Sequence, residues 1–226
     1  MANERLAAAL DYAARGWYVV PLNPQSKVLS WEMCHKLEFM WNLDQPAPTD
    51  ADIRHWFKLE PDINIGIRMA GSGLAVFDVD EMTNIHKIPG FEGNGLPCTP
   101  TVQTARGLHY YFRAPDGKES GQVRVFQPPD VSVLVGDFLT TWPATWAASV
   151  PAYVVAPPSR HPDMFTYYQW MITPDVPLAD VPDWLLAAVE PPLPPSSWFA
   201  DMSEWDEDDE AYHEAIAADF EWDDED

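Results

Sequence analysis

A succession of short β-rich segments constrains the fold of this chain more than any other feature of its sequence. Apolar and β-branched residues recur in brief runs, and Gly, Pro and polar residues interrupt them. We expect strands at 17–22, 63–69, 73–80, 101–105, 108–114, 122–126, 131–135, 151–156 and 164–170. So many strands require a sheet of substantial size, and the fold must be built around it.

Three further segments predict helices. In residues 3–15, Leu6, Leu10 and Ala13 fall on one face, and Gly16 supplies a stop. Thr49 is a suitable N-cap for a second helix over 50–59. A short helix near 183–190 closes the pattern. Helices and strands together predict one α/β (α+β) domain over residues 1–190.

A cluster of prolines between 191 and 195 marks a boundary that no helix crosses. Beyond it, residues 201–226 hold 14 Asp and Glu and no Lys or Arg. This composition is typical of a solvated, flexible tail, so we interpret 191–226 as a Pro-rich linker and an acidic tail. The alternative is a peptide that docks on a partner or on the domain's own basic groove, which the interspersed aromatic residues favour.

The net charge of -23 bears on the kind of ligand. Residues 1–200 hold 22 acids against 13 bases, a net charge of -9. Nucleic-acid binders usually present a basic surface, because phosphate contacts supply much of their affinity. Any nucleic acid must therefore be held locally, by a few basic side chains and by metal ions.

The sequence also favours a cytoplasmic location. No apolar run approaches the ~20 residues that cross a bilayer, so we expect no membrane partner. The N-terminal residues lack the apolar core of a secretory signal. Cys34 and Cys98 are the only cysteines, which suits a reducing compartment and gives no paired spacing for structural zinc.

The sharpest local feature is the pair Asp78 and Asp80 at the end of the apolar run 74–77. Residues i and i+2 of a strand share a face, so the two carboxylates are expected side by side. Two such anions repel each other, and a divalent cation with a preference for oxygen ligands relieves that repulsion. The alternative is a strand that enters a turn, where Asp is common.

A second feature is the segment 104–112, in which Arg106 and Gly107 precede a strand. Within that strand His109 and Tyr111 share one face. A lone His in a strand is usually a half-buried residue without a special role. Arg and His together can bind a triphosphate, Arg through its planar guanidinium group.

A third feature is the apolar run 153–156, which enters the corner Pro157–Pro158 and presents Ser159 and Arg160. The two prolines restrict the backbone at this corner. Taken alone, the segment is a rigid turn.

The order of these motifs resembles the bifunctional primase-polymerase domain of phages and plasmids, in the archaeo-eukaryotic primase superfamily. The resemblance spans roughly residues 5–170. It is carried by ALDYAARGWYVVPLNPQSKV (9–28), TDADIRHWF (49–57), NIGIR (64–68), SGLAVFDVD (72–80), TARGLHYYF (104–112), YVVAPPSRH (153–161) and FTYYQW (165–170).

The resemblance implies an RRM-like catalytic core with a mixed, mostly antiparallel sheet. It implies that Asp78 and Asp80 bind Mg²⁺ or Mn²⁺ and that His109 contacts the incoming nucleotide. We add four residues to the nucleotide site as expectations: Lys27, Arg106, Ser159 and Arg160. The implied reaction is attack of a primer 3′-hydroxyl, or of an initiating nucleotide, on an α-phosphate.

One departure concerns the third acid that the family places on a later strand. Ser132 stands at the position where that acid is expected. Asp130 is two residues earlier and on the same face, so we expect it to substitute, whereas Asp137 has the opposite parity and lies farther along. Without a substitute, the site would bind metal weakly and catalysis would be poor or lost.

These features favour a DNA-templated nucleotidyltransferase that makes or extends primers. Its partners would be single-stranded DNA and nucleoside triphosphates, and a replicative helicase would be a separate protein. The second hypothesis is a catalytically degenerate module that binds DNA, nucleotide or a replication partner. A third is an acidic DNA mimic, which leaves the ordered motifs without a role.

Overall fold

The computed structural model divides into two units, Met1–Glu190 and Pro191–Asp226. The residues that the structure describes all belong to the first unit. They are 3–30, 32–33, 46–80, 82–88, 90–92, 94–115, 120–127, 130–141, 152–162 and 166–189, with only the backbone described in 120–127, 130–135 and 140–141. The predicted acidic tail lies outside them.

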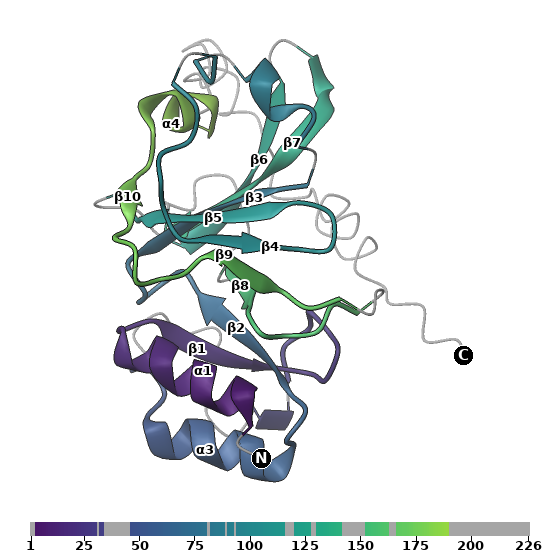
Figure 1. The fold of residues 1–226 in the computed structure, drawn as a ribbon, viewed down its shortest axis with the longest axis vertical. Helices are drawn as coiled ribbons and strands as arrows, with labels where there is room; N and C mark the ends of the chain where they lie inside the picture. The colour runs from purple at the N-terminus through teal and green to yellow at the C-terminus, as the bar shows by residue number, and fades with distance from the viewer. Residues whose placement is uncertain are drawn as a thin grey trace, which may run out of the picture. The chain divides into compact units, whose positions relative to one another are not determined.

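The first unit contains helices and two antiparallel sheets (Figure 1). The helices are α1 (Glu4–Ala14), α3 (Asp50–Leu59), the 3₁₀ turn η1 (Ile85–Lys87) and α4 (Asp183–Val189). The strands are β1 (Tyr18–Leu22), β2 (Asn64–Arg68), β3 (Leu74–Val79), β4 (Thr101–Gln103), β5 (Leu108–Arg113), β6 (Ser120–Gln127), β7 (Asp130–Thr141), β8 (Tyr153–Ala156), β9 (Gln169–Ile172) and β10 (Ala179–Asp180).

The two long N-terminal helices begin at side-chain caps. The Asn3 side chain accepts hydrogen bonds from the backbone N–H groups of Arg5 and Leu6 at the start of α1. Thr49 forms a capping box with Asp52 at the start of α3, as its N-cap position predicts. Gly16 follows α1 with a φ of 82°, a conformation that glycine adopts without a Cβ penalty.

A small sheet has the strand order β1-β2-β8, and a larger one has the order β6-β7-β3-β5-β4-β9. Every pairing is antiparallel except that of β10, which runs parallel to β5. The α+β class and the mixed, mostly antiparallel pairing are therefore confirmed. We expected one sheet, but β1, β2 and β8 form a separate one, because strand pairing is decided by contacts between segments far apart in sequence.

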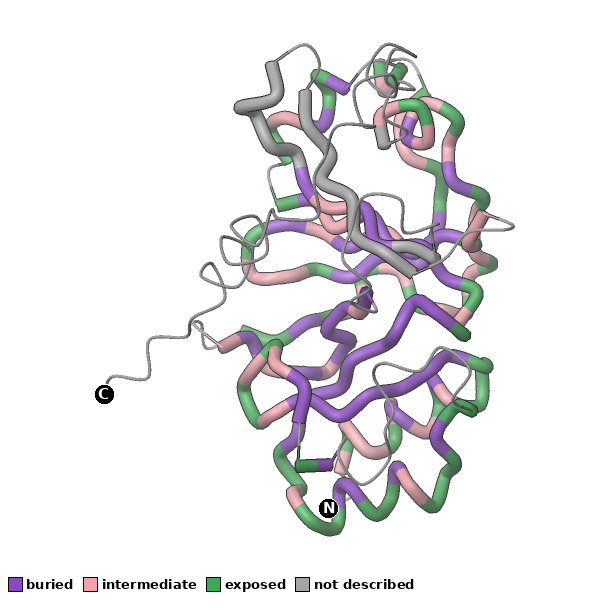
Figure 2. The backbone as a smooth tube through the Cα atoms, turned by 180° about the vertical axis from the view of Figure 1, so that it is seen from behind, coloured by how far each residue is buried: buried purple, intermediate pink, exposed green. Residues whose placement is uncertain are grey.

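Both faces of the central strand β3 are buried (Figure 2). Leu74 and Val76 pack into the core shared with the small sheet, α1 and α3. Phe77 and Val79 point the other way, into a second core that includes Leu185 of α4. Asp78 has the parity of Val76, so it faces the small sheet.

One hydrogen-bonded chain of aromatic residues links the two sheets. Trp170 Nε1 of β9 donates to the Tyr12 hydroxyl of α1 at 2.8 Å. That hydroxyl donates to the carbonyl oxygen of Pro157, after β8, at 2.7 Å. Desolvation raises the pKa of Tyr12, so the phenol stays protonated as this chain requires.

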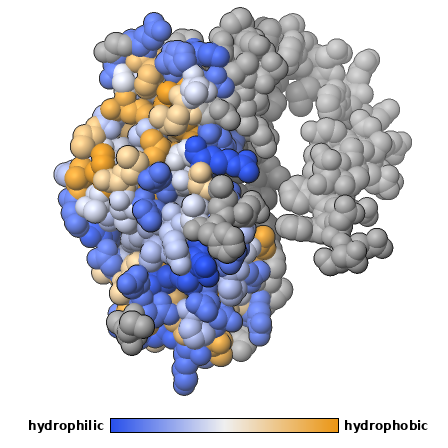
Figure 3. Space-filling view, turned by 45° about the vertical axis from the view of Figure 1, so that its right-hand side comes forward, coloured by the Kyte–Doolittle hydropathy of each residue, from blue (hydrophilic) through white to orange (hydrophobic). Residues whose placement is uncertain are grey.

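The described surface is mainly polar. Hydrophobic residues gather in the upper half of the face shown in Figure 3, and hydrophilic residues predominate in its lower half. The large hydrophobic side chains that are exposed are Leu59, Met82, Tyr167 and Met171, which come from different elements. Within the described ranges, no helix combines the length and apolar character needed to cross a bilayer.

Candidate nucleotide and metal site

Three polar residues form a row across the middle of the large sheet. Asp78 of β3 pairs with His109 of β5 on one side and with Asp137 of β7 on the other. Directly paired residues of antiparallel strands project from the same face, with Cα atoms about 5 Å apart. The row therefore faces the small sheet, because Asp78 does.

His109 and Asp78 contact each other directly. Nε2 of His109 lies 3.2 Å from Oδ1 of Asp78, and the His109 side chain is only 6% exposed. Nδ1 of His109 is buried and has no hydrogen-bond partner among the described residues. Buried polar groups usually have a partner, so this nitrogen is an exception among the described residues.

Asp80 lines the same pocket as Asp78 and His109. The residue as a whole is exposed, but its carboxyl group is partly withdrawn from solvent at the pocket. That desolvation, followed by the negative charge of Asp78, raises the pKa of Asp80, while Lys27, His109 and Arg106 oppose the shift. A cation bound beside these two carboxylates would offset the repulsion between their negative charges.

Two glycines on the neighbouring strands approach the backbone of β3 closely. A Cβ added at Gly107 would lie 1.7 Å from the carbonyl oxygen of Val79, and one at Gly136 would lie 2.0 Å from that of Asp78. Any side chain at these positions would displace the end of β3. Because both residues lack a Cβ, their strands can pack this closely against the end of β3, where the two aspartates lie.

We expect Gly107→Ala to destabilise the protein by about 2 kcal/mol or more, because the backbone around Val79 must shift. Chemical denaturation would measure the loss. Gly95→Ala is the matched control, since a Cβ there meets nothing within 4 Å and only its φ of 61° is unfavourable. The control should lose about 1 kcal/mol. Equal losses in both variants would show that the close approach at Gly107 is unimportant.

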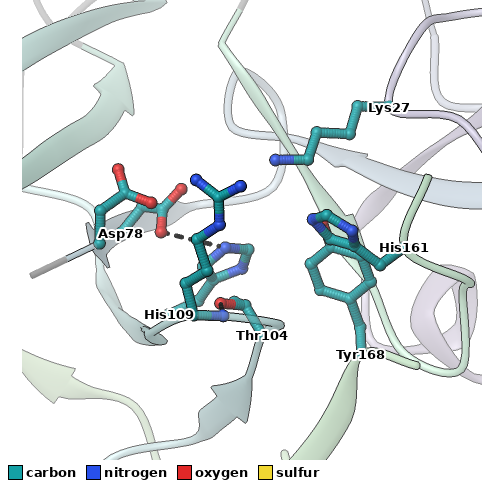
Figure 4. Close-up of a pocket in the computed structure, with 8 residues that line it drawn as sticks. Lys27, Asp78, Thr104, His109, His161 and Tyr168 are labelled. Atoms are coloured by element: carbon teal, nitrogen blue, oxygen red, sulfur yellow. Dashed lines mark hydrogen bonds and ion pairs between the residues drawn. The ribbon is translucent and has the colours of Figure 1, made fainter. Parts of the chain in front are cut away.

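The pocket has two walls, which face each other in Figure 4. Asp78 and His109 lie on the wall that the large sheet provides, where Thr104 and Arg106 also lie. Lys27, His161 and Tyr168 form the opposite wall, on segments next to the small sheet. In the described part of the chain, neither Lys27 nor Arg106 forms an ion pair, so both charges are available to an anionic ligand.

Thr104 shapes the turn that carries Arg106. Its hydroxyl oxygen accepts hydrogen bonds from the N–H groups of Arg106 at 3.3 Å and Gly107 at 2.9 Å. Its own N–H donates to the Gly107 carbonyl oxygen at 3.0 Å. This arrangement closes the turn between β4 and β5 beside the aspartates.

Five predicted site residues thus meet in one pocket: Lys27, Asp78, Asp80, Arg106 and His109. Ser159 and Arg160 do not line it. Ser159 is fully buried, and its hydroxyl bonds the backbone N–H and carbonyl of Ile65 at 2.8 and 3.3 Å. The guanidinium of Arg160 lies over the Tyr167 ring at 5.5 Å from its centre. The structure therefore gives Ser159 a role in joining β8 to β2.

The structure places Asp137, and not the predicted Asp130, as the strand neighbour of Asp78. Asp130 begins β7 and pairs with Gln127 of β6, whereas Asp137 of the same strand pairs with Asp78. Asp137 pairs with Arg124 of β6, three residues before Gln127, so the two acids lie roughly 10 Å apart along the strand direction. The predicted strand at 131–135 was too short. The later half of β7 contacts β3. Counting alternate residues from Ser132 therefore did not identify the acid next to Asp78.

Thr104, His161, Tyr168 and Asp137 were not singled out from the sequence. Thr104, His161 and Tyr168 belong to the quoted motifs, but nothing in their local pattern distinguished them from structural residues. His161 in particular lies beside Lys27 only because two loops meet in the folded chain. Asp137 was visible as a later acid and was set aside on parity.

The donor set of the pocket fits a divalent cation. Asp78 and Asp80 offer the carboxylate oxygens that Mg²⁺ and Mn²⁺ prefer. Among the described residues, no three His, Cys, Asp or Glu side chains form a complete metal-binding group. Asp137 is the nearest further acid along the row, although it does not line the pocket.

A sheet that carries paired aspartates and a histidine, faced by basic side chains, forms the kind of site that suits a metal ion and an anionic ligand. The family described as bifunctional DNA primase/polymerase, N-terminal, matches residues 9–184. The match covers most of the chain, so this protein belongs to that family. Membership gives a DNA primase/polymerase type of function in general, with DNA and nucleotides as substrates. No curated protein sequence matches the chain.

Proposed function

We propose that this protein is a DNA-templated nucleotidyltransferase that synthesises or extends primers on single-stranded DNA. The observation that carries the proposal is the meeting of Asp78, Asp80 and His109 in one pocket, opposite Lys27. These residues come from separate segments between positions 27 and 109. Because they meet in one pocket, all of them can contact the same substrate.

Asp78 and Asp80 would hold the divalent cations, Mg²⁺ or Mn²⁺, with Asp137 as the third acid. Two bound cations supply activation of the attacking oxygen and neutralisation of the leaving one. The chain's own contribution is to hold the two carboxylates together at the end of β3. Gly107 and Gly136 do this through their close approach to the β3 backbone.

His109 would contact the incoming nucleotide. Asp78 contacts its Nε2 and so orients the ring. Its Nδ1 is buried and has no hydrogen-bond partner in the described structure. Arg106 and Lys27 would bind phosphate oxygens, Arg106 through its planar group and Lys27 as a point charge. Lys27 and Arg106 place positive charge at this pocket although residues 1–200 carry a net charge of -9.

Primer extension with the purified full chain tests this function. We expect Mn²⁺-dependent extension of a labelled primer on a single-stranded template, and product formation that saturates with nucleotide. Gel analysis of product length would measure it. Reactions without divalent cation serve as the control, and extension that proceeds equally well there would contradict the proposal.

The second candidate is a degenerate module that binds nucleotide or DNA without catalysis. The acidity of residues 1–200 and Ser132 at the expected acid position favour it. Saturable nucleotide binding without any product in the same assay would support this alternative. The two candidates therefore share a substrate site and differ in the chemistry performed there.

A further inference from the structure

The wall of the pocket opposite the aspartates consists of residues from two loops. Lys27 belongs to the loop after β1, and His161 belongs to the segment after β8. Figure 4 shows both side chains facing the wall that carries Asp78 and His109. A loop side chain binds a ligand well only if its backbone is held firmly.

Asn64, the first residue of β2, holds both loops. It is fully buried, and its Nδ2 donates to the carbonyl oxygens of Ser26 at 2.9 Å and Arg160 at 2.7 Å. Its Oδ1 accepts from the N–H of Arg160 at 2.9 Å. These backbone groups belong to the residues immediately before Lys27 and His161. One buried amide therefore fixes the positions of both.

Two more contacts join the same loops. Gln25 Nε2 donates to the carbonyl oxygen of Pro162 at 3.2 Å, and the Tyr153 hydroxyl donates to that of Lys27 at 3.0 Å. With Asn64, they tie the residues on both sides of Lys27 to the segment around His161. The two loops are thus joined to each other by several hydrogen bonds.

Tyr168 lies close to both histidines of the pocket. The Tyr168 ring centre lies 5.9 Å from that of His161 and 5.9 Å from that of His109. Backbone hydrogen bonds from Tyr168 to Ser159 and from His161 to Thr166 hold this arrangement. His161 lies with Lys27 on the wall of the pocket opposite Asp78 and His109.

We infer that His161 binds the terminal phosphates of the incoming nucleotide together with Lys27, and that Asn64 is the positioning residue for both. This inference rests on the proposed function. A triphosphate is an extended polyanion, so its α-phosphate and its terminal phosphates need separate partners. The acidic wall would take the α-phosphate, and the Lys27 and His161 wall the terminal phosphates.

The test compares binding of dATP and dAMP to the full chain in Mn²⁺ without DNA, measured by calorimetry. The wild-type protein should bind dATP more tightly than dAMP. His161→Gln should weaken dATP binding about tenfold, the typical effect of losing a hydrogen bond to a charged group, and leave dAMP binding within twofold. His161→Lys should retain most of the dATP preference, and the exposed His86→Gln is the matched control.

Asn64→Asp replaces the amide donor with a carboxylate that faces two carbonyl oxygens. We expect it to weaken dATP binding and leave dAMP binding nearly unchanged, whereas general misfolding would weaken both. If the wild type binds dATP no better than dAMP, the proposed function itself fails. If the wild type prefers dATP and His161→Gln keeps that preference in full, only the present inference is overturned.

Discussion

Replacement of Asp78 and Asp80 together by Ala should abolish Mn²⁺-dependent nucleotide incorporation on single-stranded DNA. The expected loss is about a thousandfold or more, because cations at this site would supply several kcal/mol of transition-state stabilisation. Primer extension at saturating nucleotide would measure it. The size of the effect follows from the arrangement of the pocket, in which these are the carboxylates that line the cavity.

The control for this experiment is the double variant Asp50→Ala and Asp62→Ala, which removes two exposed acids away from the pocket. It should extend primers at the parent rate. The Asp78 and Asp80 variant should also stay folded, because desolvation and the charge of Asp78 raise the pKa of Asp80, so that its ionised carboxylate opposes folding and its removal relieves that cost. A folded Asp78 and Asp80 variant that incorporates nucleotide as well as the parent would overturn the assignment.

The second large effect concerns the third acid. Asp137→Asn should reduce extension about a hundredfold and weaken Mn²⁺ binding, because Asp137 is the cross-strand neighbour of Asp78. Asp130→Asn should leave both within about twofold, since Asp130 lies at the other end of β7. Extension assays and calorimetric Mn²⁺ titrations would measure the pair.

These two variants make a matched comparison, because they apply the same chemical change on the same strand. A loss in Asp130→Asn with full activity in Asp137→Asn would mean that β7 pairs with β3 in a different register. Equal losses in both would indicate damage to the strand itself. In either case Asp137 would not be the third acid.

The acidity of the chain is easier to understand once the pocket is known. The free charges of Lys27 and Arg106 are placed where a nucleotide's phosphates would lie, and no broad basic surface is needed for that contact. The carboxylates that add to the negative charge include the pair that would bind cations. Net charge therefore describes this protein poorly, and the local arrangement of charge describes it better.

Several features were predictable from short stretches of sequence. The alternation in 73–80 placed Asp78 on the face of Val76, and the alternation in 108–114 placed His109 with Tyr111. Thr49 predicted the start of its helix as an N-cap residue. Each of these depends on backbone geometry that a few neighbouring residues determine, so each can be recognised without knowing the rest of the fold.

The tertiary structure decided which distant segments meet. Register between β3 and β7 placed Asp137, and not Asp130, beside Asp78. The buried amide of Asn64 brought His161 next to Lys27, and the burial of Ser159 removed it from the pocket. Local periodicity is repeated by every strand and cannot specify its partner, whereas register and loop packing depend on contacts between residues 38 to 96 positions apart in the sequence. For that reason the sequence determined the acidic pair and its histidine, and only the folded chain determined what surrounds them.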